Sequence, residues 1–235
     1  MKPVAILRHA YGEGPGYLAT VLDRHFIPWQ LIRVDDGASV PRDACSFSGL
    51  ALMGGPMSAN DSLPWIGEEL ALICDCRARD IPVIGHCLGG QMMAKAFGAT
   101  VVKNPVKEIG WGTVRVVESA VAGTWFGRIR EFAAFHWHGE TFGLPAGATH
   151  ILSSTHCAHQ AFAVGPHLGM QCHIEMTESM IVDWCKSGAA EIAACALSSV
   201  QSAAQMQADM ERHLAVLGAV ADRVYTHWID GLPRS

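Results

Sequence analysis

The sequence has no segment typical of a membrane-spanning or secreted protein. No uninterrupted apolar stretch reaches the roughly 18 residues of a membrane span, and the apolar run behind Met1 is too short for a signal peptide. Cys-x-x-Cys motifs are also absent. We therefore expect a soluble, cytoplasmic protein whose 8 cysteines are reduced and serve mostly as small core side chains.

Charge is scarce as well. Charged residues make up 17% of the 235 residues, and the formal net charge is -5. This mild acidity offers no electrostatic footprint for nucleic acid or an anionic membrane, so we expect neither of those partners. Hydrophobic residues make up 50% of the chain, which is enough for a buried core and excludes a disordered protein.

The N-terminal part of the chain alternates short apolar runs with helix-like segments. The strand-like runs cover residues 4–7, 31–34, 50–53 and 81–85, and helices are expected over 18–25, 64–79 and from the last of these strands to residue 97. In the second helix, Ile66, Leu70 and Ile73 fall on one face. This alternation predicts an α/β fold with an open, mostly parallel central sheet flanked by helices.

The rest of the chain has a different pattern. Residues 100–117, 131–137, 148–155 and 161–174 are short strand-like runs separated by Gly, Pro and Asn, which predicts an antiparallel extension of the sheet. The tail is expected to be helical, with an apolar stripe that packs on the body, formed by Met210, Leu214, Leu217, Ala221 and Val224. We expect one domain over residues 1–235, with a catalytic core at about 1–176 and a helical C-terminal extension at about 177–235.

The segment around Cys87 carries the strongest chemical signal. An apolar strand runs directly into Gly85-His86-Cys87-Leu88-Gly89 and then into a helix, which is the cysteine version of the strand–nucleophile–helix elbow. The glycines permit the tight turn, and the start of the helix favours the thiolate. Taken alone, Cys87 would be one more buried cysteine, but this context predicts a nucleophile. His86 is expected to be structural, because neighbouring side chains diverge at such a turn.

A cysteine nucleophile needs a base, and the base needs a group that fixes its tautomer. Among the 12 histidines, His173 stands apart because an apolar strand is expected to end in His173-Ile174-Glu175. Residues two apart at a strand end can point the same way, so Glu175 can orient the imidazole. A histidine without this pattern would more often be an ordinary core or surface residue. Cys87, His173 and Glu175 are therefore the predicted catalytic triad.

An acyl intermediate also needs two N–H donors for its oxyanion. We expect one from the amide of Leu88, directly after the nucleophile. The other is expected from Gly55 in the loop 53–58, which follows a strand and lacks side chains where a backbone must approach the substrate. The alternative for this loop is a plain Gly-Pro turn.

Together these segments resemble the class I, or triad, glutamine amidotransferase family. The matching motifs are Gly54-Gly55-Pro56, residues 85–91, Glu108-Ile109-Gly110-Trp111, residues 135–141 and residues 171–175. The likeness covers residues 45–176 well and the first 40 residues loosely. Ile174 and Cys172 stand where the family usually has proline and often has an aromatic residue, and neither change removes a reacting group.

The resemblance implies the flavodoxin-like class I glutaminase fold and a hydrolase or transferase acting at a γ-glutamyl amide through a cysteine thioester. Cys87 would attack the glutamine side-chain carbonyl, ammonia would leave, and water would hydrolyse the thioester. Gln91, His138, Gly139 and Glu140 match family positions that hold the substrate amino acid. No cofactor is implied. The ammonia would pass to a separate synthetase partner, or the chain would work alone as a γ-glutamyl peptidase or hydrolase of small γ-glutamyl compounds.

Three other interpretations are weighed against an enzyme: a regulatory protein, a redox protein and a metal site. A non-catalytic regulatory protein with this fold is disfavoured because all three triad positions are filled. A redox role is disfavoured because Cys74 and Cys76, two apart on an expected helix, point in different directions. His136 and His138 resemble a zinc pair, but no Cys or carboxylate of suitable spacing completes the set, so no metal is expected.

Overall fold

The structure is a computed structural model that describes residues 1–234. Its strands are β1 (Val4–Arg8), β2 (Trp29–Arg33), β3 (Gly49–Leu52), β4 (Val83–His86), β5 (Val101–Val116), β6 (Glu131–Phe142), β7 (Thr149–Ser154), β8 (Ala161–Val164) and β9 (His167–Met170). Its helices are α1 (Tyr17–Arg24), α2 (Pro64–Ala78), α3 (Leu88–Ala96), α4 (Ala120–Phe126), α5 (Glu178–Ser187), α6 (Ala189–Ala193), α7 (Ala203–Gln207) and α8 (Met210–Asp230), with a 3-10 turn η1 (Val34–Asp36).

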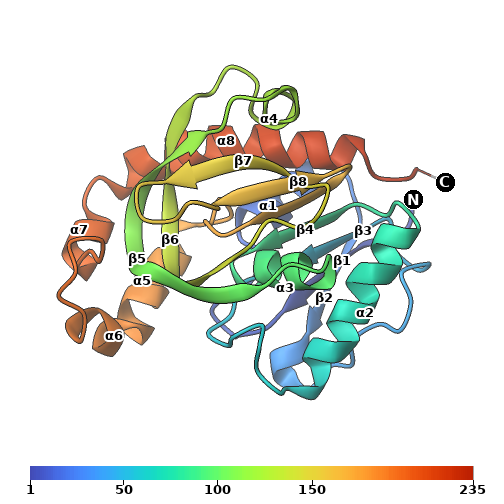
Figure 1. Cartoon of the computed structure of the whole chain (residues 1–235), viewed down its shortest axis with the longest axis horizontal. Helices are drawn as coiled ribbons and strands as arrows, with labels where there is room; N and C mark the ends of the chain where they lie inside the picture. Colours follow the sequence, from blue (N-terminus) through green and yellow to red (C-terminus); the bar gives the residue numbers. More distant parts are fainter. Residues whose placement is uncertain (235) are drawn as a thin grey trace.

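All of these strands join one 9-stranded sheet with the order β2-β1-β3-β4-β9-β8-β7-β5-β6 (Figure 1). The strands from β2 to β9 in this order pair in parallel, and the remaining pairs are antiparallel. This confirms the predicted α/β fold with a mostly parallel sheet and an antiparallel extension.

The prediction of a single extension strand over residues 161–174 is wrong. The chain turns back at Gly165, whose φ of 53° suits glycine, and forms the two strands β8 and β9. β8 belongs to the antiparallel part, whereas β9 lies parallel to β4 in the middle of the sheet. A strand this short leaves no periodicity that could reveal its central position.

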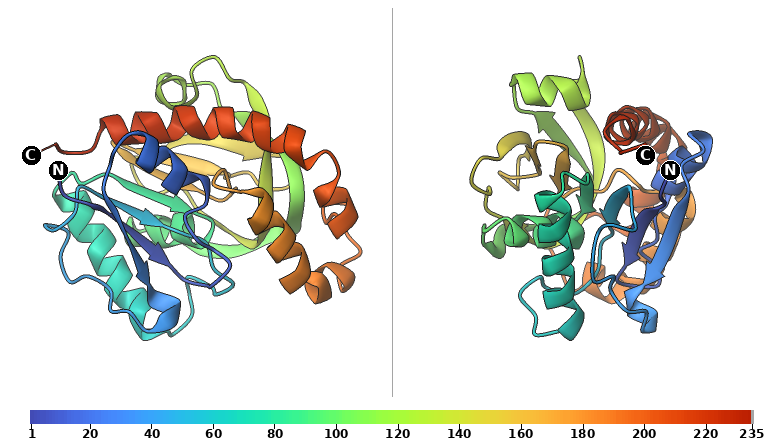
Figure 2. Two further views of the ribbon diagram at one scale, coloured as in Figure 1. Left: turned by 180° about the vertical axis from the view of Figure 1, so that it is seen from behind. Right: turned by 90° about the vertical axis from the view of Figure 1, so that its right-hand side faces the viewer.

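Helices cover both faces of the sheet. Residues of α1, α4, α5 and α8 share one apolar cluster with the sheet, and residues of α2 and α3 share a second. Figure 2 shows α8 crossing the back of the molecule beside α1, with α2 on the other side. Among the described helices, none combines the length and apolar character that a membrane crossing requires.

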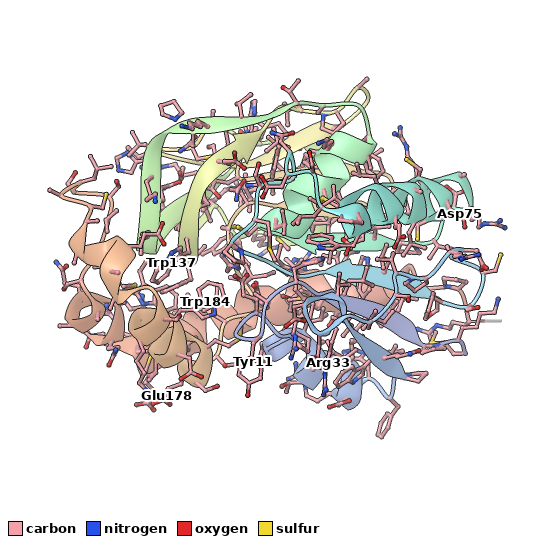
Figure 3. The ribbon with its side chains drawn as sticks, turned by 90° about the horizontal axis from the view of Figure 1, so that it is seen from below. Tyr11, Arg33, Asp75, Trp137, Glu178 and Trp184 are labelled. Atoms are coloured by element: carbon pink, nitrogen blue, oxygen red, sulfur yellow. The ribbon has the colours of Figure 1, made fainter. Side chains whose placement is uncertain are left out.

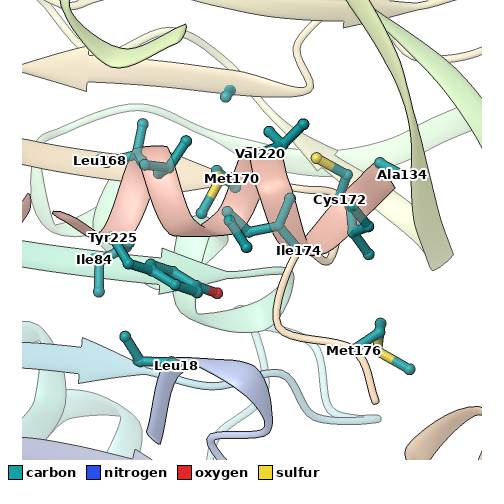
Figure 4. Close-up of a cluster of buried hydrophobic side chains, with 14 of the residues drawn as sticks. Leu18, Ile84, Ala134, Leu168, Met170, Cys172, Ile174, Met176, Val220 and Tyr225 are labelled. Atoms are coloured by element: carbon teal, nitrogen blue, oxygen red, sulfur yellow. The ribbon is translucent and has the colours of Figure 1, made fainter. Parts of the chain in front are cut away.

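The long helix α8 packs as its apolar stripe predicts. Leu217, Ala221 and Val224 are buried, and Met210 and Leu214 pack partly buried against the same cluster. Figure 4 shows this helix among the side chains of Leu168 and Met170 of β9, with the Tyr225 ring on the same side of the helix as Ile84 of β4. The tail is therefore an integral part of the core.

The parallel strands bring four loops to one edge of the sheet. Leu7 of β1 pairs with Leu52 of β3, and Leu52 pairs with Gly85 of β4. His86 of β4 pairs with Met170 of β9. The segments that follow these strands therefore start side by side, at the edge where open α/β sheets bind ligands.

Candidate active site

Cys87 lies at a strained turn between β4 and α3. Its φ of 51° and ψ of -108° are unusual for a residue other than glycine, and such outliers persist where the surrounding structure holds them. The Cys87 amide donates to the carbonyl of Met170 at 2.8 Å, which ties the turn to β9. The elbow expected from the sequence is present.

The glycines around Cys87 are required by close packing. A Cβ at Gly85 would lie 2.5 Å from the backbone of Gly89, and a Cβ at Gly89 would overlap the carbonyl of Leu52. The start of α3 thus rests directly on the backbone of the neighbouring strands. Leu88 is the first residue of this helix, so its N–H has no intrahelical partner.

The sulfur of Cys87 borders a pocket of about 640 Å³. The residue is 6% exposed. Gln171 Nε2 donates to Sγ at 3.5 Å, and Sγ lies 3.8 Å from the carbonyl oxygen of Trp137. The thiol is therefore held in place while one side remains open to the pocket.

His173 borders the same pocket and is oriented by Glu175. Its Nδ1 lies 2.6 Å from Glu175 Oε1, and both side chains are 1% exposed. β9 ends at Met170, so the expected strand through His173 is wrong; a single bridge to Phe135 holds the histidine instead. Within the described chain His173 Nε2 has no hydrogen-bond partner, which leaves this nitrogen available for proton transfer.

The charges of His173 and Glu175 stabilise each other. Burial alone would lower the pKa of His173, but the charge of Glu175 and interactions with Cys87 and Glu175 raise it well above its usual value. Burial alone would raise the pKa of Glu175, but the His173 and His86 imidazoles bring it down to about 2. His173 and Glu175 therefore form a buried imidazolium–carboxylate pair beside Cys87.

His86 is not positioned as a base. Its Nε2 lies 2.9 Å from the hydroxyl of Tyr225 on α8 and 3.8 Å from Glu175 Oε2. Burial lowers the pKa of His86, which favours its neutral form. The side chain therefore connects Tyr225 of the helical tail to Glu175 of the triad.

The loop that carries Gly55 is held by a buried ion pair that the sequence did not reveal. His9 Nδ1 lies 2.9 Å from the carbonyl of Met53 and 3.2 Å from that of Gly54, and its Nε2 lies 3.0 Å from a carboxylate oxygen of Glu69. Carbonyls and carboxylates only accept, so both ring nitrogens donate and His9 is an imidazolium. Although burial alone would lower it, the pKa of His9 is raised by Glu69 and by the two carbonyls.

This pair binds the carbonyls of Met53 and Gly54, the two residues that precede Gly55. Of the described residues, none accepts a backbone hydrogen bond from the amide of Gly55. A Cβ at Gly55 would lie 2.8 Å from Leu88 Cδ2, so the two predicted oxyanion donors belong to adjoining backbone segments. We interpret His9 and Glu69 as positioning residues for Gly55.

Changing Glu69 to Gln tests this interpretation. The neutral amide no longer holds His9 as an imidazolium, so the ring has one N–H in place of two, and only one of its two tautomers still donates to the loop carbonyls. We expect kcat to fall on the order of 10²-fold, as for loss of one oxyanion donor, with little change in KM. We also expect the free energy of unfolding to fall by about 3 kcal/mol.

A pH series of unfolding supplies the control. Because the pKa of His9 is raised on folding, its stabilising contribution is complete below its unfolded value and is lost as pH rises through the folded value. Wild type should therefore lose stability as pH rises through this range, and the Gln variant should lose less. Equal kcat values in the two proteins would contradict the positioning role.

The predicted substrate-binding residues all reach the pocket. Gln91, His138, Gly139 and Glu140 line it. Gln91 Nε2 donates to Gln171 Oε1 at 3.1 Å, which in turn links Gln91 to the nucleophile. His138 Nδ1 lies 3.0 Å from the Glu140 carbonyl, so the imidazole helps to fix the backbone of Glu140 at the edge of the pocket.

Another wall of the pocket comes from residues that no sequence motif singled out. Trp184, Ser187, Gly188 and Glu191 of the α5–α6 segment line it. Figure 3 shows Trp184 of this segment beside Trp137 of β6, with ring centroids 6.0 Å apart. The tail therefore contributes to the pocket as well as to the core.

Glu108, His136 and His138 form a buried cluster next to the pocket. Their potential ligand atoms lie within 4.8 Å of one another, so the expectation that no carboxylate completes the histidine pair is wrong. Pairing of β5 with β6 sets Glu108 opposite His138. The Glu108 carboxylate already accepts from Ser154 Oγ at 3.0 Å and Gln160 Nε2 at 2.9 Å, so a hydrogen-bonded network accounts for its burial without an ion.

Comparison with known proteins points to one family. The profile of the "Glutamine amidotransferase class-I" family matches residues 21–181. The glutamine amidotransferase-like protein YfeJ of Salmonella typhimurium is 31% identical over 220 residues, which is 88% of this chain and 90% of that protein. One subunit of the glutamine-hydrolyzing GMP synthase of Thermoplasma acidophilum is 32% identical over 57% of this chain and 68% of its own length.

Solved structures agree with these sequence relatives. A glutamine amido transferase from Methylobacillus flagellatus superposes with a TM-score of 0.97 at 44% identity and covers 100% of this chain and 97% of its own. A glutamine amidotransferase from Thermotoga maritima has a TM-score of 0.87 at 26% identity, with 97% and 98% of the two chains covered. Both alignments include the helical tail.

Proposed function

The chain belongs to the class-I glutamine amidotransferase family, and we propose that it hydrolyses or transfers γ-glutamyl amides with Cys87 as nucleophile, His173 as base and Glu175 as the residue that orients it. One observation carries the proposal. The sulfur at the strained turn and the free nitrogen of His173 border one pocket, and Glu175 holds the other nitrogen of that ring at 2.6 Å.

The proposed reaction follows from this arrangement. The Cys87 thiolate attacks the γ-carbonyl carbon, and the amides of Leu88 and Gly55 stabilise the oxyanion. His173 Nε2 delivers a proton to the departing amine, which leaves a γ-glutamyl thioester. A water molecule, deprotonated by the same nitrogen, attacks the thioester and releases glutamate and the thiol.

Two destinations for the amine are consistent with the family. The GMP synthase relatives support transfer of ammonia to a synthetase partner, since one of them is named as a separate subunit. The α5–α6 wall supports the alternative of a stand-alone γ-glutamyl hydrolase, because it builds a pocket on one side of Cys87 from this chain's own residues.

An assay of the purified protein distinguishes these versions. It compares glutamate release from glutamine and from γ-glutamyl dipeptides without any partner. Rapid release from dipeptides is the result expected of a stand-alone hydrolase, and slow release that a synthetase accelerates is expected of an ammonia donor.

A glutamine-like diazo-ketone tests the nucleophile directly. We expect one label per chain, on Cys87. Cys45 and Cys74 are exposed free thiols and serve as internal controls. Labelling at either of them with Cys87 unmodified, together with no release of glutamate from any substrate, would contradict the proposed function.

A further inference from the structure

The pocket is larger than glutamine requires. Its volume of about 640 Å³ falls within the ~300–1,000 Å³ of sites that enclose drug-sized ligands. The family resemblance places the γ-glutamyl group near Gln91, Gly139 and Glu140. The remaining space must therefore accept the amine part of the substrate, if the proposed function holds.

Glu13 lies where the amine departs. A Cβ at Gly54 would overlap Glu13 Oε2 and lie 3.2 Å from His173 Cε1, so the Glu13 carboxyl and the ring that protonates the leaving amine both lie beside Gly54. Glu13 is in the loop after β1 and lines the pocket. A group attached to the amine nitrogen would pass this carboxyl.

Two tryptophans stand on the same side of the pocket. The ring of Trp184 meets His173 edge-on, with centroids 4.9 Å apart, and Trp137 lies perpendicular to Trp184 at 6.0 Å. Both indoles line the pocket. Such aromatic surfaces bind hydrocarbon chains and attract cations.

No lysine or arginine neutralises Glu13 on this side of the described pocket lining, where the nearby positive charges are the imidazoliums of His173 and His9. Among the described residues that line the pocket, Lys107 is the only Lys or Arg, and its Nζ is bound to Glu191 Oε1 at 2.5 Å. Glu191 also accepts from Trp137 Nε1 at 2.8 Å. Glu191 is thus neutralised, whereas Glu13 faces no lysine or arginine in this described lining.

The groups around Glu13 make its carboxyl sensitive to a bound cation. Burial raises the pKa of Glu13 to about 7, and Glu175 adds to this rise, while His173 and His9 oppose it. An ammonium group next to Glu13 would favour the ionised form and return the carboxyl toward its usual pKa.

We propose that Glu13 selects γ-glutamyl amides whose amine part carries a second, positively charged amine, with Trp137 and Trp184 lining the path of the connecting hydrocarbon chain. The substrate class is a γ-glutamyl diamine. This inference rests on the proposed function, since it assigns the leaving-group side of the same site.

A matched substrate series tests the proposal. The γ-glutamyl amides of 1,4-diaminobutane, n-butylamine and 4-aminobutyrate differ chiefly in the charge at the far end of the amine. At pH 8 we expect kcat/KM for the cationic amide to exceed that for the neutral amide by about tenfold, with the anionic amide lowest. In Glu13→Gln the cationic and neutral values should differ by less than about threefold.

Two controls isolate the role of Glu13. Glu178→Gln changes an exposed residue at the start of α5 and should keep the wild-type ratio. Because the pKa of Glu13 is about 7, lowering the pH from 8 to 6 should protonate the carboxyl and reduce the ratio in wild type but not in Glu13→Gln.

The outcomes separate this inference from the proposed function. Equal or better cleavage of the neutral or anionic amide by wild type at pH 8 overturns the assignment of Glu13, while cleavage itself supports the Cys87 mechanism. A ratio that Glu13→Gln leaves unchanged also overturns it. Failure to cleave every substrate, glutamine included, overturns both.

Discussion

Replacing Cys87 by alanine is expected to lower turnover of γ-glutamyl amides on the order of 10⁶-fold, as removal of a triad nucleophile does. The alanine side chain cannot form the thioester, and the remaining donors can only bind and polarise the substrate. The fold should persist, because alanine and cysteine share the same Cβ and face the same cost at a φ of 51°. Glutamate release and thermal unfolding measured on one preparation check both statements.

Cys76 supplies the matched control. It is also a buried free thiol, but it lies on α2, and burial raises the pKa of this thiol to about 12. Cys76→Ala should retain turnover and lose about 1 kcal/mol of unfolding free energy. If Cys87→Ala kept turnover comparable to that of Cys76→Ala, the assignment of the nucleophile would be wrong.

Glu175→Gln is the second change with a large expected effect, about 10⁴-fold in kcat. The amide keeps the shape of the side chain, but it has an N–H as well as an oxygen to offer His173 Nδ1. The imidazole then loses both its fixed tautomer and the charge that stabilises its protonated form. KM should change far less than kcat, because Glu175 does not line the pocket.

The pH dependence of kcat/KM and of stability distinguishes a loss of the Glu175 charge from a general disruption of the fold. The Glu175 charge raises the pKa of His173, so the variant should lose its imidazolium at a lower pH, and the alkaline limb of kcat/KM should move down. In wild type the pKa of Glu175 is lowered from 4.5 to about 2, so its contribution to stability is present above 4.5 and is lost as pH falls toward 2. The variant should lack this loss, and an unchanged pH profile would contradict the role of Glu175.

The sequence predicted the parts of the site that lie close together along the chain. The elbow at Cys87 depends on local backbone rules, and the contact between His173 and Glu175 spans two residues. Such short-range relations are visible in spacing alone. The helical tail was predictable for the same reason, since its apolar stripe repeats along one helix.

Contacts between distant residues that carry no motif were not predictable. His9 and Glu69 are 60 residues apart and carry no motif, although His9 directly follows a strand that ends at the ligand-binding edge. Glu13, Trp184 and Glu191 meet only because the loop after β1 and the α5–α6 segment fold over the same pocket. Glu108 joins His136 and His138 through strand pairing alone.

The position of β9 has a consequence for how the chain folds. Gly85 of β4 pairs with Gly169 of β9. The strand that joins the parallel and antiparallel halves of the sheet is therefore synthesised long after β4, its parallel neighbour. Contacts so distant in sequence carry a large loop-closure entropy and slow folding. During synthesis the exposed edge of β4 must wait until β9 emerges from the ribosome, and we expect chaperones that shield unpaired strand edges to matter most in that interval.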